Sequence, residues 1–190
     1  MLKIGIIGRS QRGSESLPAA MLDSAAEIGR LVAQHGAALV NGGMGGVMEA
    51  SARGAREAGG LTVGFLPGSD EKDANPYMDL VFATGMGTLR NLLTARCCDS
   101  IIMIGGGVGT LNEVTLAYDS GVPVVVLEGS TGWSDRLRGT LYDEHYLDER
   151  RVVAVTYASS PADAVAQAVA RSTEVRRLPH LPAHMGWAGQ

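Results

Sequence analysis

Two glycine-rich stretches have the composition of a loop that binds an anion. "NGGMGG" covers residues 41–46, "GGGVGT" covers residues 105–110, and each precedes a helical pattern. A glycine-rich turn that opens a helix presents unpaired backbone N–H groups and the positive end of the helix dipole, which suits phosphate. Neither stretch is a P-loop, because no lysine follows its glycines. Neither completes a G-x-G-x-x-G fingerprint, because the last position is Thr110 in one and Met48 in the other.

Two charged residues lie close to these turns. Arg90 falls in the first turn of a predicted helix that follows "GMGT", where a cation opposes the positive end of the helix dipole. A nearby anion would remove this conflict, and the candidates are a bound phosphate and Glu113. Glu113 lies near the start of the next predicted helix, within reach if the fourth and fifth predicted strands end side by side. A surface arginine without a role is the alternative.

Thr110 and Glu113 also have an interpretation that needs no ligand. Their spacing, T-x-x-E at a helix start, matches a capping box, in which each side chain satisfies the other's backbone N–H. The two interpretations are compatible, since Thr110 can cap the helix while its neighbours bind a phosphate.

Short apolar runs alternate with helical patterns along the chain. The predicted strands are Lys3–Gly8, Ala37–Val40, Leu61–Pro67, Asp79–Thr84, Ser100–Ile104, Val122–Glu128 and Arg151–Thr156. The predicted helices are Pro18–His35, one ending near Ala58, one from about Thr88 with Leu89, Leu92, Leu93 and Cys97 on one face, one ending near Ser120, and Ser160–Arg171. Continuously apolar strands that alternate with helices predict an α/β, Rossmann-like, doubly wound fold with a mostly parallel sheet of about seven strands.

The length of 190 residues predicts one such nucleotide-binding domain over residues 1–172, followed by an extended tail over 173–190. In the tail, His180 and His184 have the spacing of helical metal ligands, but Pro182 argues against that helix. The polar loop at residues 67–78 is interpreted as a solvated connection, with a lid as the alternative. No metal site is expected.

Composition excludes several classes of function. The net charge of −4 shows no basic footprint for nucleic acid, and no apolar run is long enough to span a membrane. The cysteines, Cys97 and Cys98, are adjacent, which favours a reduced, cytoplasmic protein without a disulfide framework or zinc site. Glu128 lies at the end of a strand about 20 residues beyond a glycine turn, which keeps an NAD-binding interpretation open.

The chain resembles the Rossmann-like LONELY GUY family, the cytokinin-activating phosphoribohydrolases long labelled "possible lysine decarboxylase", and above all its bacterial branch with molybdenum cofactor carrier proteins. "NGGMGGVMEASARGAREAGGLTVGFLP" and "TLRNLLTARCCDSIIMIGGGVGTLNEV" carry the similarity, which covers about Lys3 to Arg171. In that family, an arginine nine residues before a strand-leading aspartate and the glutamate closing P-G-G-x-G-T-x-x-E form the catalytic pair. Counting back from Asp99 gives Arg90, and the motif closes at Glu113.

The resemblance also assigns ligand contacts to the turns. The implied phosphate- or nucleotide-binding residues are Gly8, Ser10, Gly42, Gly43, Gly45, Gly46, Gly106, Gly107, Gly109 and Thr110. Two positions depart from the hydrolase pattern: Gly105 replaces a proline, and Asn91 replaces a lysine beside the arginine. Carrier-like members also lack the full hydrolase pattern.

The leading hypothesis is hydrolysis of the N-glycosidic bond of a nucleoside 5′-monophosphate, with no cofactor. Glu113, kept ionised by the helix N-terminus, would activate water and stabilise the sugar cation, while Arg90 would hold the phosphate or ribose. The rival is a carrier or sensor of molybdenum cofactor or a related phosphorylated ligand. A decarboxylase would need a pocket lysine for its Schiff base, whereas the chain offers Lys3 on the first strand and Lys72 in a polar loop. The family further implies a homodimer or higher homo-oligomer.

Overall fold

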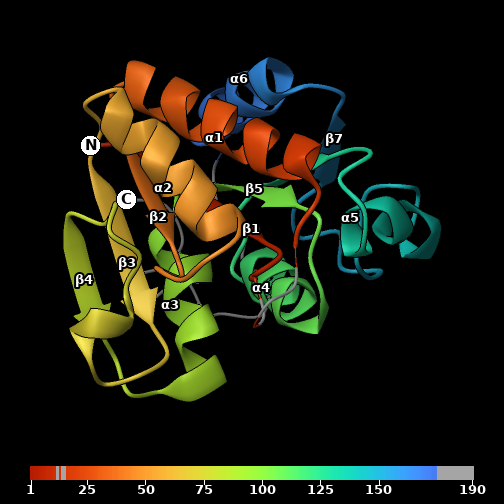
Figure 1. Ribbon diagram of the computed structural model, residues 1–190. Coiled ribbons are helices and arrows are strands. Elements are labelled where there is room, and N and C mark those ends of the chain that lie inside the picture. Colours follow the sequence, from red (N-terminus) through yellow and green to blue (C-terminus); the bar gives the residue numbers. More distant parts are fainter. Residues whose placement is uncertain (12, 14–15, 175–190) are drawn as a thin grey trace.

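The structure, a computed structural model, describes residues 1–11, 13 and 16–174 (Figure 1). From residue 175 onward the predicted tail lies outside the described residues, as do His180 and His184. The division into a domain over 1–172 and a tail therefore stays a prediction.

The described residues form a seven-stranded sheet in which all neighbouring strands are parallel. The strands are β1 (Lys3–Gly8), β2 (Ala38–Asn41), β3 (Thr62–Leu66), β4 (Leu80–Ala83), β5 (Ser100–Ile104), β6 (Val124–Leu127) and β7 (Val155–Ala158). Their order across the sheet is β4-β3-β2-β1-β5-β6-β7. This order confirms the doubly wound, Rossmann-like fold that the alternating pattern predicts.

Helices cover both faces of the sheet, with α1, α2 and α6 on one face and α3 and α4 on the other (Figure 1). The helices are α1 (Ala19–Gln34), α2 (Val47–Glu57), α3 (Asn91–Cys97), α4 (Val108–Asp119), α5 (Trp133–Arg136) and α6 (Pro161–Arg171), with short 3-10 turns η1 (Glu71–Asp73), η2 (Gly87–Arg90) and η3 (Leu137–Thr140). The sheet is therefore the middle layer of a three-layer structure.

Strand β5 shows why its apolar run is continuous. Ile102 and Ile104 pack into the core beneath α1 and α6, while Ile101 and Met103 pack into the core beside α3 and α4. Side chains alternate between the two faces of a strand, so a strand covered on both faces needs apolar residues at every position.

Helices α1 and α2 pack so closely that their backbones nearly touch. A Cβ atom on Gly29 of α1 would lie 1.9 Å from the Ser51 carbonyl oxygen, and one on Gly54 of α2 would lie 1.9 Å from the Ala26 carbonyl oxygen. Glycine is required at both positions, because no larger residue fits without moving one helix away from the other.

The η2 turn and helix α3 each expose a leucine to solvent, while Ala95 of α3 packs into the core. Leu89, just before the helix, is 72% exposed, and Leu92 is exposed as well, whereas Asn91 and Thr94 are buried. The face that carries the leucines is thus the outer face, and the polar face packs against the protein. This orientation brings the polar residues of α3 toward α4 and the carboxyl end of β1.

The last strand begins later than the sequence predicts. Instead of Arg151–Thr156, β7 spans Val155–Ala158. Arg151 has a φ of +50°, which interrupts an extended strand. Val152 and Val153 pack against Tyr118 in a small separate cluster, so their apolar character reflects that contact rather than the sheet.

The chain reverses direction across the sheet at β1. Strands β1 to β4 are added outward on one side, and the chain then returns to place β5 on the other side of β1. Such a switch point opens a crevice at the carboxyl ends of the two central strands. The condition that the fourth and fifth strands end side by side is not met, because β4 is an edge strand and three strands separate it from β5.

We expect Gly54→Ala to destabilise the fold by about 1–3 kcal/mol, because the added methyl would overlap the Ala26 carbonyl. The sign of this change in stability is informative, since replacing a helical glycine with alanine otherwise stabilises a protein by up to ~1 kcal/mol. Urea unfolding measures the effect. Gly139→Ala is the control, because a Cβ atom there would meet nothing within 4 Å. Equal stability of Gly54→Ala and the parent protein would contradict the packing described.

Candidate functional site

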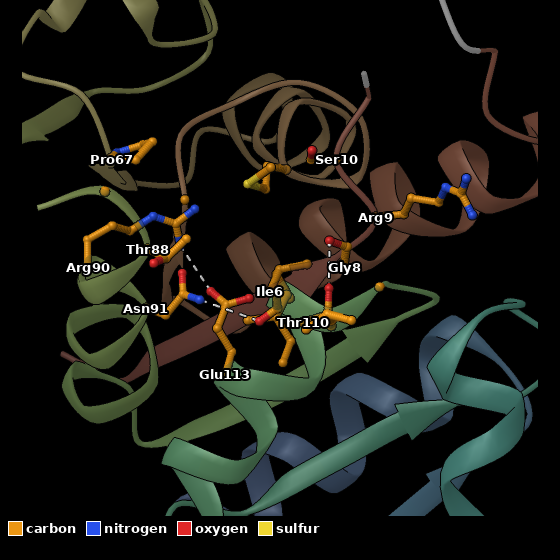
Figure 2. Close-up of a pocket in the computed structure, with 17 residues that line it drawn as sticks. Ile6, Gly8, Arg9, Ser10, Pro67, Thr88, Arg90, Asn91, Thr110 and Glu113 are labelled. Atoms are coloured by element: carbon orange, nitrogen blue, oxygen red, sulfur yellow. Dashed lines mark hydrogen bonds and ion pairs between the residues drawn. The ribbon is translucent and has the colours of Figure 1, made fainter. Parts of the chain in front are cut away.

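A pocket of about 440 Å³ lies at the carboxyl ends of β1 and β5, in the crevice at the switch point (Figure 2). It is lined by Ile6, Ile7, Gly8, Arg9, Ser10, Gly42, Met48, Pro67, Gly87, Thr88, Arg90, Asn91, Gly107, Val108, Gly109, Thr110 and Glu113. The lining combines an apolar floor, backbone of two glycine-rich loops and a few polar side chains, which is the usual composition of a small-molecule site.

The second glycine-rich loop turns the chain from β5 directly into α4. Gly105 and Gly106 have φ values of +62° and +106°, in the region that favours glycine. Gly107 is the N-cap of α4, and no side chain caps this helix. The first N–H groups of a helix have no partner within it, so those at the start of α4 are available to an anion in the pocket.

The predicted capping box is therefore wrong. The Thr110 hydroxyl donates instead to the Gly8 carbonyl at 3.0 Å, as Figure 2 shows. Glu113 is the sixth residue of α4, beyond its first turn, and its carboxylate faces Arg90. Thr110 thus ties the start of α4 to the end of β1 across the crevice.

The first glycine-rich loop is held by two asparagines. The Asn41 side chain accepts from the Gly43 N–H at 2.7 Å and donates to the Met48 carbonyl at 2.9 Å. From the loop at residues 67–78, Asn75 donates to the carbonyls of Gly43 and Met44, at 3.0 Å each. Part of this loop is thus anchored onto the glycine-rich turn.

Arg90 and Glu113 form an ion pair inside the pocket. The Arg90 Nη1 and Glu113 Oε1 atoms are 3.1 Å apart, and the two side chains are only 11% and 10% exposed. Arg90 Nη1 also donates to the Thr94 hydroxyl at 3.4 Å. The Arg90 Nε atom is buried without a hydrogen-bond partner among the described residues. Since this nitrogen has almost no accessible surface, a ligand in the pocket would reach it only after the Arg90 side chain moved.

Gly42 explains how the arginine fits. A Cβ atom at this position would lie 2.5 Å from Arg90 Nη2. The first glycine-rich loop therefore passes directly against the guanidinium group, and a side chain there would displace it.

Burial changes the acid–base behaviour of Glu113. Loss of solvation raises the pKa of its carboxyl to about 7, although the Arg90 charge and hydrogen bond oppose the rise. Glu113 lies beyond the first turn of α4, so the group that favours its ionised form is Arg90 rather than the helix N-terminus. From pH 4.5 to 7 the folded protein keeps a proton here that the unfolded chain has lost, so this group's contribution to stability falls as pH rises.

Asn91, where the hydrolase pattern has lysine, lies beside the pair. Its Nδ2 atom donates to Asn112 Oδ1 at 2.9 Å and lies 3.5 Å from the Gly109 carbonyl. Figure 2 shows the guanidinium of Arg9, the other arginine of the lining, pointing away from Glu113. The charge of the Arg90 guanidinium is therefore balanced by Glu113 rather than supplemented by a neighbouring cation.

The structure brings together most of the residues singled out in the sequence. Eight of them line the pocket: Gly8, Ser10, Gly42, Arg90, Gly107, Gly109, Thr110 and Glu113. Four shape the loops behind it instead: Gly43, Gly45, Gly46 and Gly106. The apolar floor of Ile6, Ile7 and Met48 was not anticipated, although the end of a central strand is the signal that would have indicated the two isoleucines.

Other candidate groups lie outside the pocket lining. Glu128 pairs with Arg138, which gives the NAD-binding interpretation no support. Lys3 pairs with Asp99 at 2.8 Å, and Lys72 is exposed in η1, so neither reaches the pocket as a Schiff-base lysine would. The described residues hold no cluster suited to a metal ion. None of their helices combines the length and apolar character required to cross a bilayer.

Comparison with known proteins points to one superfamily. The chain is 32% identical to the cytokinin riboside 5′-monophosphate phosphoribohydrolase of Mycobacterium tuberculosis, over 71% of this chain and 80% of that protein. The X-ray structure of TM1055 is 38% identical, with a TM-score of 0.83 over 88% of this chain and 98% of the other.

The molybdenum cofactor carrier protein of Chlamydomonas reinhardtii is also similar. It is 30% identical, with a TM-score of 0.75 over 92% of this chain and 100% of the carrier. These similarities confirm the resemblance to the phosphoribohydrolases and to the carrier proteins. Residues 1–165 match the model of one family, and the chain belongs to that family, the SLOG cluster4 family.

Proposed function

We propose that this protein hydrolyses the N-glycosidic bond of a nucleoside 5′-monophosphate and releases the free base and ribose 5-phosphate. The observation that carries the proposal is the buried Arg90–Glu113 pair, 3.1 Å apart, in the same pocket as the uncapped start of α4. A catalytic-type carboxylate and a phosphate-binding helix end are thus within one small cavity. The similarity to a phosphoribohydrolase supports this reaction.

Glu113 is suited to the chemical step. Cleavage of a glycosidic bond passes through a transition state with positive charge on the sugar, which a nearby carboxylate stabilises. With a pKa of about 7, Glu113 also exchanges a proton near neutral pH, so it can take a proton from the attacking water. Arg90 orients this carboxylate through the bond from its Nη1 to Glu113 Oε1.

The glycine-rich loop supplies binding energy away from the reacting bond. The N–H groups at Gly107, Val108 and Gly109 would receive the 5′-phosphate, with the α4 dipole favouring its negative charge. Binding energy from a remote group of the substrate positions the sugar against the carboxylate. The same N–H groups would hold any ligand with a terminal phosphate.

A carrier of a phosphorylated ligand such as molybdenum cofactor is the second candidate. Asn91 favours it, because an amide bonded to Asn112 replaces the lysine of the hydrolase pattern. The similar structure of a molybdenum cofactor carrier protein adds support. In this function the pocket holds its ligand, and Glu113 fixes Arg90 without reacting.

The protein acts, in our proposal, as a homo-oligomer in a reduced, cytoplasmic setting. Leu89 and Leu92 form an apolar outer face on η2 and α3, and Val108, 76% exposed, lies at the start of the adjacent α4. A second copy covering this face would remove apolar surface from water. The proposal of a reduced setting rests on the adjacency of Cys97 and Cys98, a spacing that provides no disulfide framework.

Glu113→Gln should lower base release by at least about 100-fold, because the amide can neither accept the water proton nor stabilise the sugar cation with a charge. Chromatography of free base, after incubation with a panel of nucleoside monophosphates, measures it. Glu57→Gln, at an exposed site on α2, is the matched control and should keep full activity.

Tight nucleotide binding by the parent protein with no base release would exclude the hydrolase. Co-purified molybdopterin, detected by its fluorescence after oxidation, would then identify the carrier.

The pH profile should report the carboxyl of Glu113. Because the reaction needs the ionised form and burial raises the pKa to about 7, kcat/KM should rise about tenfold per unit below pH 7 and level off above it. The substrate phosphate also titrates in the acid range, so nucleotide binding by Glu113→Gln, measured across the same pH range, separates the two effects. A profile that is flat from pH 5 to pH 8 after this correction would contradict the assignment.

Leu89→Lys should dissociate the proposed oligomer, because a charge cannot be buried cheaply at an apolar contact. Light scattering coupled to size-exclusion chromatography would show a smaller mass, with the unfolding midpoint of the monomer little changed. Tyr142→Lys, at an exposed aromatic residue outside η2 and α3, controls for added charge. If the parent protein is itself monomeric at micromolar concentration, the oligomer proposal fails.

A further inference from the structure

The loop between β6 and α5 is bonded to the second glycine-rich loop from behind the pocket. The Gly105 N–H donates to Ser130 Oγ at 2.8 Å, and the Ser134 hydroxyl donates to the Gly105 carbonyl at 3.0 Å. The Ser130 hydroxyl in turn donates to the Leu127 carbonyl. Both polar groups of the Gly105 backbone are therefore bound by serine side chains.

Neither serine can contact a ligand directly. Ser130 and Ser134 are 6% and 2% exposed, and neither belongs to the pocket lining. Each hydroxyl donates its one proton to a backbone carbonyl, at 2.5 Å for Ser130 and 3.0 Å for Ser134. Any influence on the pocket must pass through the glycine-rich loop.

The two loops also meet backbone to backbone. The Trp133 N–H donates to the Gly106 carbonyl at 3.1 Å. A Cβ atom on Gly132 would lie 2.4 Å from that carbonyl oxygen, and one on Gly105 would lie 2.7 Å from the Ser130 carbonyl oxygen. All three glycines have positive φ, and so does Thr131 between the serines, at +67°. A non-glycine residue in this region indicates a conformation imposed by its surroundings.

The departure at residue 105 fits this arrangement. Proline has a φ near −65° and no N–H. The observed loop has a φ of +62° at Gly105 and uses its N–H to bind Ser130. The backbone seen here is therefore incompatible with the proline of the hydrolase pattern, and the serines supply a restraint that a proline ring would otherwise provide.

We infer that Ser130 and Ser134 are positioning residues that hold the Gly105–Gly106 backbone so that the N–H groups at the start of α4 point at a ligand phosphate. The inference rests on the proposed binding of a phosphorylated ligand in this pocket, but it does not require turnover. It applies equally to a hydrolase and to a carrier.

The test compares a probe that carries a 5′-phosphate with a nucleoside that lacks one. Calorimetry would measure the binding of ribose 5-phosphate and of adenosine to the parent protein, to Ser130→Ala and to Ser134→Ala. Loss of one hydrogen bond should weaken ribose 5-phosphate binding about three- to tenfold. Adenosine binding should change less than twofold, because adenosine does not use the N–H groups of α4. The double variant should lose more than either single one.

The controls separate positioning from folding. Ser100→Ala removes a hydroxyl that is equally buried but has no partner among the described residues, at the amino end of β5, and should change neither affinity. Ser130→Thr keeps the hydroxyl and should restore ribose 5-phosphate binding toward the parent value. Gly105→Pro should weaken ribose 5-phosphate binding more than either alanine variant does.

Equal weakening of both probes, or of neither, would overturn the inference, as would a parent protein that does not bind ribose 5-phosphate. Selective weakening in a protein that releases no base would support the inference while the hydrolase proposal fails.

Discussion

The arrangement of the residues around the pocket depends on the contact between the Arg90 guanidinium and the Glu113 carboxylate. Both groups are buried, and a buried charge is tolerated when it is paired and hydrogen-bonded. Removing one partner of such a pair costs about 3–5 kcal/mol, since the other charge is left without compensation. The pair therefore constrains two neighbouring segments. Helix α3 must present its polar face inward, and the first glycine-rich loop must have a glycine at residue 42 to leave room for the guanidinium.

Much of the binding surface around this pair is backbone. The turns after β1, β2 and β5 all reach the pocket, and polar side chains hold two of them in place. Asn41 and Asn75 bind the first glycine-rich loop, while Ser130 and Ser134 bind the second. A site built from backbone N–H groups recognises the shape and charge of a phosphate. The positions of these groups are only as precise as the side-chain hydrogen bonds that restrain the loops. The supporting polar residues are thus as much a part of the site as the glycines.

The sequence predicts the sheet well because its strands are buried on both faces. Runs such as "SIIMI" leave no ambiguity about burial, and six of the seven strands start and end within two residues of the predicted limits. The glycine turns and Arg90 were recognisable from local chemistry and from the resemblance. The irregular segment before β7 was not recognisable, because the apolar pattern does not show the left-handed backbone of Arg151 or the packing of Val152 and Val153 against Tyr118.

Three features of the site could not be predicted from the hydrophobic periodicity or from the sequence motifs. The outer face of α3 is apolar, so a pattern that assigns leucines to the core selects the wrong side. The raised pKa of Glu113 depends on how many atoms surround it in the folded chain. Ser130, in the β6–α5 loop, and Ser134, in α5, have no spacing that marks them, since they bind a backbone segment 25 residues or more away in the sequence.

The position of the pocket at the switch point determines when it forms during folding. Its two walls belong to halves of the sheet that form from successive segments of the chain, β1 to β4 and β5 to β7. Thr110 and Gly8, which join the walls, are 102 residues apart in the sequence. Contacts of such long range form late and slowly compared with local ones. The crevice and its buried charges thus form only once both halves of the sheet have packed together. A partly folded chain therefore has no partial pocket that its ligands could bind.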